Sequence, residues 1–137
     1  MFKGWGRRQG EKAAGPGPST KQIGDSAEDR ALAYLQQQGL RLVQRNYRLA
    51  GGPHQRGAEI DLILQDRDGT LDFVEVRTRR NAAQGGAAGS VSAQKQQRIV
   101  RAAQHYLMGL AVLPPCRFDV VAIESDALSW LPAAFGA

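Results

Sequence analysis

The feature that most constrains the fold of this 137-residue chain is the order in which its hydrophobic periodicity changes. Apolar side chains first recur at helical spacing over residues 25–39. Three segments then alternate apolar and polar side chains as strands do: 40–49, 59–65 and 70–78. Helical spacing returns over 93–110, and a last clear strand follows at 117–124. This α-β-β-β-α-β order predicts an α/β fold, with one mixed sheet and the helices packed against it.

The ends of both predicted helices carry capping signals. Asp25 is a good N-cap for the first helix, and Gly39 supplies its C-terminal stop. Glu28 lies three residues after Asp25, where the glutamate of a capping box belongs. Ser92 can cap the second helix. Glu28 therefore has a structural explanation that stands beside any functional role.

The segments outside this core differ from each other in composition. Residues 1–21 are rich in Gly, Pro, Lys and Arg and show no periodicity, which predicts a disordered basic arm. Residues 22–137 are expected to form a single domain. The tail after residue 124 keeps large apolar side chains, so we expect it to dock on the core. These side chains are Leu128, Trp130, Leu131 and Phe135.

Composition narrows the class of protein. A net charge of +5 and a pI near 9.9 fit an anionic partner such as nucleic acid, and equally fit a charge that only aids solubility. The single cysteine, Cys116, excludes an internal disulfide and a cysteine-rich zinc site. No apolar run approaches the ~18 residues that a membrane span needs, and the N-terminus lacks the apolar core of a signal peptide. We therefore expect a cytoplasmic protein that makes no membrane contact.

Acidic side chains interrupt the second and third predicted strands. Asp61 and Glu75 lie fourteen positions apart. A turn with an odd number of residues, or a bulge, would place them opposite each other on one face of a hairpin. A four-residue turn at DRDG would instead pair Asp61 with Val74 and direct the two acids to different faces. The register therefore stays open.

An acidic pair of this kind has two explanations. Two adjacent carboxylates repel each other unless a cation joins them, and oxygen ligands suit Mg²⁺ or Mn²⁺. The structural alternative is that both acids lie at the rim of the domain and pair with arginine side chains. The arginines available for such pairs are Arg45, Arg48 and Arg77.

Six motifs follow one another along the chain in an order that resembles a known family. They are GDSAEDRALAYL (24–35), RNYR (45–48), EIDLI (59–63), FVEVRTR (73–79), QKQQR (94–98) and RFDVV (117–121). Together they resemble the YraN-like family of small bacterial proteins, which is related to PD-(D/E)xK nucleases and Holliday-junction resolvases. The resemblance covers about residues 23–135 and implies a restriction-endonuclease-like αβββαβ core.

The resemblance also implies a metal site and its residues. Asp61 falls on the metal-binding aspartate of these nucleases, Glu75 on the acid of their E-x-K motif, and Glu28 on a helix glutamate near the metal. The implied cofactor is Mg²⁺ or Mn²⁺, held with the help of the carbonyl of residue 76. Arg77 stands where these nucleases carry a lysine. Because arginine stays protonated, Arg77 cannot be a general base, although it can hold a phosphate or a water molecule.

A stretch of basic residues of one sign begins at the implied site. From Arg77 to Arg117 the chain has seven arginine and lysine residues and no acid. A phosphate backbone would have to pass the metal site, so we expect binding to nucleic acid, most of all DNA, through phosphate contacts. The residues expected to bind it are Arg79, Arg80, Lys95, Arg98 and Arg101.

Three functions remain open on the sequence alone. The first is a magnesium-dependent endonuclease that hydrolyses phosphodiester bonds in DNA, such as branched or repair intermediates. The second is a non-catalytic nucleic-acid-binding module with a degenerate nuclease site, which the arginine at position 77 favours. The third is a protein-interaction scaffold whose acidic cleft is only structural. The oligomeric state is also open, with a homodimer as one alternative.

Overall fold

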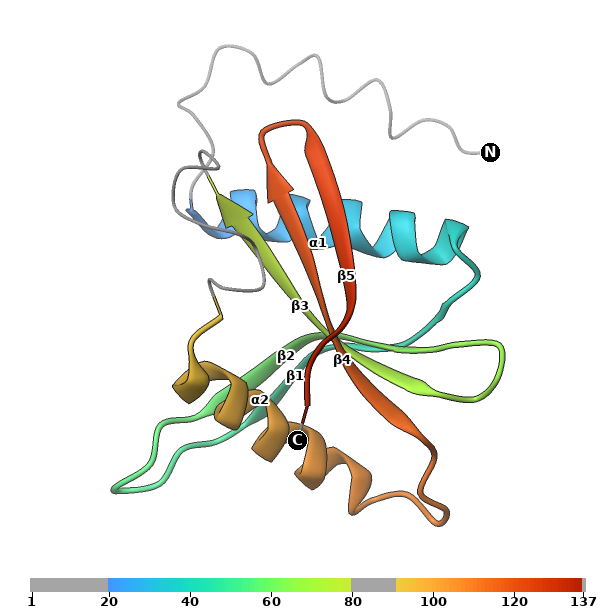
Figure 1. Ribbon diagram of the computed structural model, residues 1–137. Coiled ribbons are helices and arrows are strands. Elements are labelled where there is room, and N and C mark those ends of the chain that lie inside the picture. The colour runs from blue at the N-terminus through green and yellow to red at the C-terminus, as the bar shows by residue number, and fades with distance from the viewer. Residues whose placement is uncertain (1–19, 80–90, 137) are drawn as a thin grey trace.

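The computed structural model describes residues 20–79 and 91–136. Helices α1 and α2 span Thr20–Gln37 and Ala93–Leu107. Five strands form one sheet in sequence order: β1 (Arg41–Leu49), β2 (Ala58–Gln65), β3 (Leu71–Arg79), β4 (Cys116–Glu124) and β5 (Ala127–Phe135). Strands β3 and β4 run parallel, and the other neighbouring pairs run antiparallel (Figure 1). The predicted α/β fold with a mixed sheet is confirmed.

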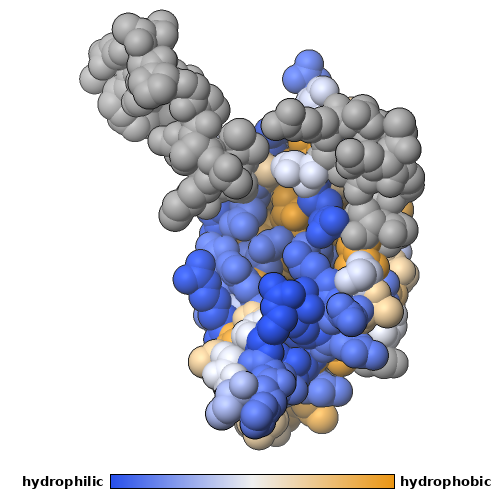
Figure 2. Space-filling model, turned by 90° about the vertical axis from the view of Figure 1, so that its left-hand side faces the viewer, coloured by the Kyte–Doolittle hydropathy of each residue, from blue (hydrophilic) through white to orange (hydrophobic). Residues whose placement is uncertain are grey.

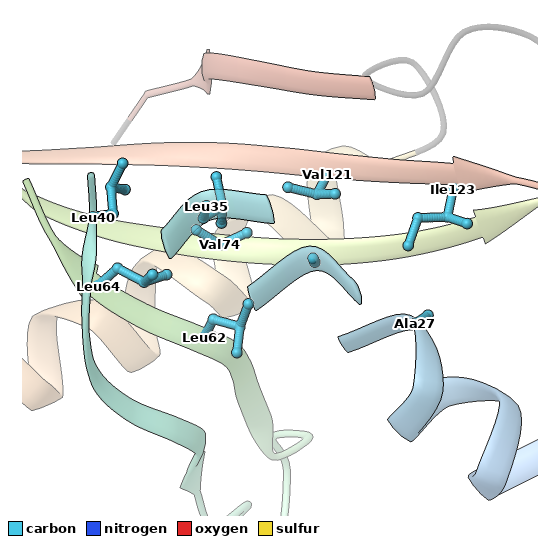
Figure 3. Packing of buried hydrophobic residues seen from close by; sticks show 9 residues of the cluster. Ala27, Leu35, Leu40, Leu62, Leu64, Val74, Val121 and Ile123 are labelled. Carbon is cyan, nitrogen blue, oxygen red and sulfur yellow. The ribbon is translucent and has the colours of Figure 1, made fainter. Parts of the chain in front are cut away.

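The two helices cover opposite faces of the sheet. Consecutive side chains along a strand point to opposite faces, so Phe73 and Val74 mark the two sides of β3. Val74 packs in a cluster with Leu35 of α1 (Figure 3), whereas Phe73 packs in a second cluster with Ile99 of α2. Each fully buried side chain of this size stabilises the fold by about 1.5–3 kcal/mol. The result is a three-layer α/β/α arrangement, consistent with a restriction-endonuclease-like core.

The helix ends agree with the sequence at Ser92 and Gly39 and correct it at the start of the first helix. Ser92 caps α2, and Gly39 follows α1 with a φ of 99°, a backbone conformation that glycine adopts readily. However, α1 begins at Thr20, so Asp25 lies within the helix and is not its N-cap. Glu28 is therefore not part of a capping box. No proline lies between Thr20 and Gln37, and one glycine inside a helix costs only about 1 kcal/mol, so the helix continues through Gly24.

The segment after β4 is a strand, a form that the sequence did not predict. Strand β5 lies antiparallel to β4, with Val121 opposite Trp130. Pro132 is tolerated because β5 is an edge strand and Pro132 falls in its irregular part, where it is not paired with a residue of β4. The pairing is irregular between Phe118 and Val120. This interruption conceals the strand period in the sequence.

A buried network of charged side chains fastens β5 to the sheet. Asp119 is fully buried, and its Oδ1 accepts a hydrogen bond from the Ala133 N–H (2.8 Å). Its Oδ2 accepts from Trp130 Nε1 (2.9 Å) and from Arg117 Nε (3.2 Å). Arg117 also contacts Asp72 (3.4 Å), whose pKa is raised to about 9, by burial first and then by Asp119. Asp72 is therefore protonated at neutral pH, and Arg117 is bound inside this structural network.

Some predictions fall outside the described part of the chain. They concern most of the basic arm (1–19), Arg80 and the side chain of Arg79. Within residues 20–79 and 91–136, neither helix is long and apolar enough to cross a membrane.

Candidate functional site

The turn between β2 and β3 decides the register of the acidic pair. Gln65 pairs with Leu71 and Leu62 pairs with Val74, so the turn is the five-residue segment 66–70. A hydrogen bond from the Asp66 N–H to the Thr70 carbonyl (2.8 Å) closes it. The odd number of turn residues brings Asp61 opposite Glu75, one step beyond the Leu62–Val74 pair. The two acids thus lie together on one face, and the alternative with Val74 opposite Asp61 is excluded.

Elements from four parts of the chain converge on a cleft around this pair. The cleft has a volume of about 340 Å³, and its charged lining comes from α1, β2, β3 and α2. The charged residues are Glu28, Asp61, Glu75, Arg77 and Lys95. The side of the molecule on which β3 ends and α2 begins is covered mainly by hydrophilic residues (Figure 2). The structure therefore brings together every acid that the sequence assigned to the site.

The surroundings of Asp61 disfavour its charged carboxylate and raise its pKa. Its Oδ2 accepts a hydrogen bond from the Val76 N–H on β3 (2.8 Å), which favours the charged carboxylate. Burial, followed by the negative charge of Glu75, outweighs this bond and raises the pKa of Asp61 to about 8. Near neutral pH, Asp61 would therefore gain from a nearby cation more than an ordinary aspartate does.

Glu75 has a cationic partner that the sequence analysis did not identify. Its side chain is only 4% exposed, and Oε2 lies 2.8 Å from Lys95 Nζ and 3.7 Å from Arg77 Nη1. Lys95 was expected to bind DNA from the polar side of its helix. It lies one turn before the buried Ile99, and this spacing is the signal that could have placed it at the site. The Ser92 side chain accepts a hydrogen bond from the Lys95 N–H and so fixes the start of the helix.

Glu28 is positioned by the neighbouring edge strand. Arg45 of β1 lies 3.6 Å from Glu28 and 2.9 Å from Asp29. Asn46 has a φ of 53°, and the orientation of its amide that satisfies both neighbours donates to Glu28 Oε1 (3.3 Å) and Glu59 Oε2 (2.9 Å). Arg45 therefore pairs with Glu28, which lines the cleft, and with the more exposed Asp29 next to it. Arg48 Nε lies 3.6 Å from Glu59 Oε2 and pairs with that acid.

The carboxylates of the cleft suit a divalent ion that takes some of its ligands from the protein and the others from water or phosphate. Within the described ranges, no group of three or more His, Cys, Asp or Glu side chains is arranged to hold a metal. Asp61 and Glu75 supply two carboxylates, and Val76 lines the same cleft. Mg²⁺ is commonly bound through one or two carboxylates together with waters and phosphate oxygens. Asp61 and Glu75 are therefore compatible with a partial ligand set for Mg²⁺ or Mn²⁺, and Glu28 lines the same cleft.

The basic residues divide between the site and its surroundings. A second hollow of about 190 Å³ shares Asp61, Glu75 and Lys95 with the cleft and is also lined by Arg56 and Arg98. Arg101 Nη2 donates a hydrogen bond to the main-chain carbonyl of Arg56 (2.5 Å), which ties α2 to the β1–β2 connection. Arg56 was missed by the sequence analysis because only the fold brings its loop to α2.

The comparisons with known proteins agree on one family. Residues 27–123 match the profile of "Uncharacterised protein family UPF0102". A UPF0102 protein of Methylibium petroleiphilum is 68% identical over 119 residues, which cover 87% of this chain and 98% of that protein. A UPF0102 protein of Paracidovorax citrulli is 56% identical over 132 residues, covering 93% and 96%. One of Albidiferax ferrireducens is 59% identical over 119 residues, covering 87% and 91%. The matched profile runs from α1 to β4 and includes every described residue of the cleft.

Proposed function

The chain belongs to uncharacterised protein family UPF0102, and we propose that it is a metal-dependent, nuclease-like protein that binds DNA and hydrolyses phosphodiester bonds. The observation that supports this most is the Asp61–Glu75 pair, two mostly buried acids that lie beside cations in a surface cleft. Buried acids without full compensation are costly for the fold, and perturbed acids in clefts are typical of functional sites.

The side chains divide the proposed chemistry among them. A bound Mg²⁺ or Mn²⁺ would supply an activated water and positive charge at the phosphate. Asp61 and Glu75 would hold the ion, and the Asp61–Val76 hydrogen bond sets the distance between β2 and β3 there. Arg77 would contact the scissile phosphate and stabilise the charge that develops on it, since arginine keeps its proton. Glu28 would orient water at the edge of the ion.

The proposed substrate is DNA, with branched or repair intermediates as the first structures to test. Lys95 and Arg98 place positive charge next to the acids, and Arg56 extends it toward the β1–β2 connection. Contacts of this kind read the phosphate backbone and its shape rather than the base sequence. A cytoplasmic location is part of the same proposal.

The decisive experiment is a cleavage assay on labelled duplex, nicked and four-way-branched DNA with Mg²⁺, Mn²⁺ or EDTA. Metal-dependent cleavage that Asp61→Asn removes supports the nuclease. DNA binding without cleavage by the wild type, in all substrates and both metals, rejects it in favour of a non-catalytic binding module. Binding of neither metal nor DNA favours the protein-interaction scaffold.

The basic residues of α2 predict a measurable salt dependence of DNA binding. Replacing Arg98 and Arg101 with alanine should weaken DNA affinity and flatten the slope of log K against log salt by up to about two units. Arg67→Ala is the matched control, because Arg67 is an exposed arginine of the 66–70 turn and does not line either hollow. Fluorescence anisotropy at several salt concentrations measures the slopes. An unchanged slope in the double variant would mean that this helix face is only solvated.

Arg77 should contribute to the chemical step through its charge. We expect Arg77→Ala to slow single-turnover cleavage on the order of a hundredfold, as the loss of a charge-stabilising donor does. Arg77→Lys should keep or raise the rate, because lysine retains the charge and can also orient water. Rates are compared at saturating protein, so that weaker DNA binding does not contribute. Equal rates for wild type and Arg77→Ala would remove Arg77 from the mechanism.

A further inference from the structure

Lys95 holds an unusual position for a basic residue of a DNA-binding surface. Its ammonium lies 2.8 Å from Glu75 Oε2, and Glu75 is almost completely buried. Its side chain is 35% exposed, so it connects the interior of the site with the solvent. It is also the cation that lines both the cleft and the adjoining hollow. Lys95 therefore contacts the buried acid and lines both hollows at the same time.

Two cations meet at the same carboxylate oxygen, and they are not equivalent. Arg77 is 3.7 Å from Glu75 Oε2, against 2.8 Å for Lys95, so the closer ion pair comes from α2 and not from the strand that carries Glu75. A lysine ammonium is a compact charge on a flexible stem, whereas the arginine group is planar and rigid. Lys95 can therefore exchange one anionic partner for another by rotating its side chain.

We propose that Lys95 is the internal counter-ion of the metal site. Its ammonium pairs with the Glu75 carboxylate while the site holds no metal, and it moves to a substrate phosphate when a divalent ion binds. This inference rests on the proposed metal binding by Asp61 and Glu75. A divalent ion on Glu75 would repel an ammonium held a few ångströms away. A DNA phosphate in the adjoining hollow offers that ammonium a new partner.

This exchange couples the binding of metal to the binding of DNA. Without DNA, a metal ion must displace Lys95 from Glu75 and leave the ammonium without an anion, so metal affinity is low. With DNA present, the phosphate receives Lys95 and metal affinity rises. Linkage requires the reverse as well, so metal must raise the affinity for DNA by the same factor.

The test is a titration of the full chain with Mn²⁺, with free Mn²⁺ measured by electron paramagnetic resonance. The wild type, Lys95→Met and Lys95→Gln are compared without DNA and with a short nuclease-resistant phosphorothioate duplex. Both variants should bind Mn²⁺ about tenfold more tightly than the wild type without DNA. Added DNA should raise their Mn²⁺ affinity much less than it raises that of the wild type.

Two further variants separate this exchange from a general effect of charge. Arg98→Met removes the same charge from the adjoining hollow but keeps the Lys95–Glu75 pair, so the gain in its Mn²⁺ affinity without DNA should be several-fold smaller than the gain of Lys95→Met. Lys95→Arg keeps the positive charge but replaces the compact ammonium with a planar group, so its Mn²⁺ affinity without DNA should stay closer to that of the wild type than the affinity of Lys95→Met does. Lys95→Gln serves if Lys95→Met does not fold, because its amide can still hydrogen-bond Glu75 without carrying charge.

The outcomes distinguish this inference from the proposed nuclease activity. Mn²⁺ affinities that do not change on removal of Lys95, or change equally in Arg98→Met, overturn the counter-ion role even if DNA is cleaved. Tighter Mn²⁺ binding by Lys95→Met in a chain that cleaves no DNA supports the counter-ion role while the nuclease fails. A wild type and variants that bind no Mn²⁺ overturn both.

Discussion

An Asp61→Asn variant is expected to lose DNA cleavage while its folded state becomes more stable at neutral and alkaline pH. Asparagine keeps an oxygen that can accept the hydrogen bond from the Val76 N–H but carries no charge to bind a metal ion. Cleavage should fall by about a hundred- to a thousandfold or more. DNA binding in EDTA should be retained, because the basic residues are unchanged.

The gain in stability follows from the raised pKa of Asp61. The pKa is about 8 in the folded chain against an ordinary value of 3.8, so the folded state holds a proton that the unfolded state has released between these values. Stability of the wild type must then fall as pH rises through this window, and the full penalty is present above about pH 8. Asparagine removes the penalty, which is on the order of 2–5 kcal/mol.

Urea unfolding in EDTA at several pH values measures this difference. The advantage of Asp61→Asn should be small near pH 4 and largest above pH 8. Asp68→Asn is the control with the opposite sign, since hydrogen bonds from Thr70 lower the pKa of the exposed Asp68. That variant should lose stability at neutral pH, and the loss should vanish in acid. An Asp61→Asn chain less stable than the wild type at pH 8 would contradict the raised pKa of Asp61.

Asp119→Ala should be among the most destabilising single changes in the protein, at about 3–5 kcal/mol. The side chain is fully buried and accepts hydrogen bonds from Arg117, Trp130 and the Ala133 N–H. Alanine would leave these donors without their acceptor and would remove a charge partner from Arg117. The shift of the urea midpoint, at an unchanged m value, measures the loss.

Asp72→Asn provides the matched comparison within the same network. Burial and the adjacent Asp119 raise the pKa of Asp72 to about 9, so asparagine replaces a carboxyl that is already neutral at pH 7. We therefore expect the stability of Asp72→Asn relative to the wild type to rise steadily from about pH 4 to pH 9, because the unfolded wild-type chain releases this proton above its ordinary pKa of 3.8 and the folded chain only near 9. A loss at pH 7 as large as that of Asp119→Ala would show that Asp72 is ionised in the folded chain.

The core elements were predictable because burial on one face leaves a local periodic trace. The α2 stripe that includes Ile99 and the strand alternation of β2 are examples. The register of the β2–β3 hairpin left no such trace, because Thr70 can either end a turn or begin a strand without disturbing the alternation. Only the hydrogen bond between Asp66 and Thr70 distinguishes the two. Likewise, a capping preference worth about 1 kcal/mol at Asp25 did not decide where α1 begins.

The site residues on β2 and β3 could be predicted from the sequence, whereas those contributed by other elements were harder to predict. Asp61 and Glu75 follow from motif and spacing. Lys95 does not, because a charged side chain is ordinarily assigned to the solvent-facing side of a helix. Asn46 contacts Glu28 and Glu59 from a left-handed backbone conformation in β1. Arg56 contacts α2 from the β1–β2 connection. Contacts of this kind depend on long-range pairing and leave no periodic signal.

The parallel pairing of β3 with β4 also determines the order in which the protein can assemble during synthesis. Strands β1, β2 and β3 follow one another as a local meander, so the Asp61–Glu75 pair can meet early. Leu71, however, finds its partner Cys116 only after all of α2 has left the ribosome. Until then the strand that carries Glu75 has an open edge, and closing so long a connection is slow compared with forming a hairpin. In a nascent chain, Asp61 and Glu75 would thus come together before α2 and β4 have completed the domain around them.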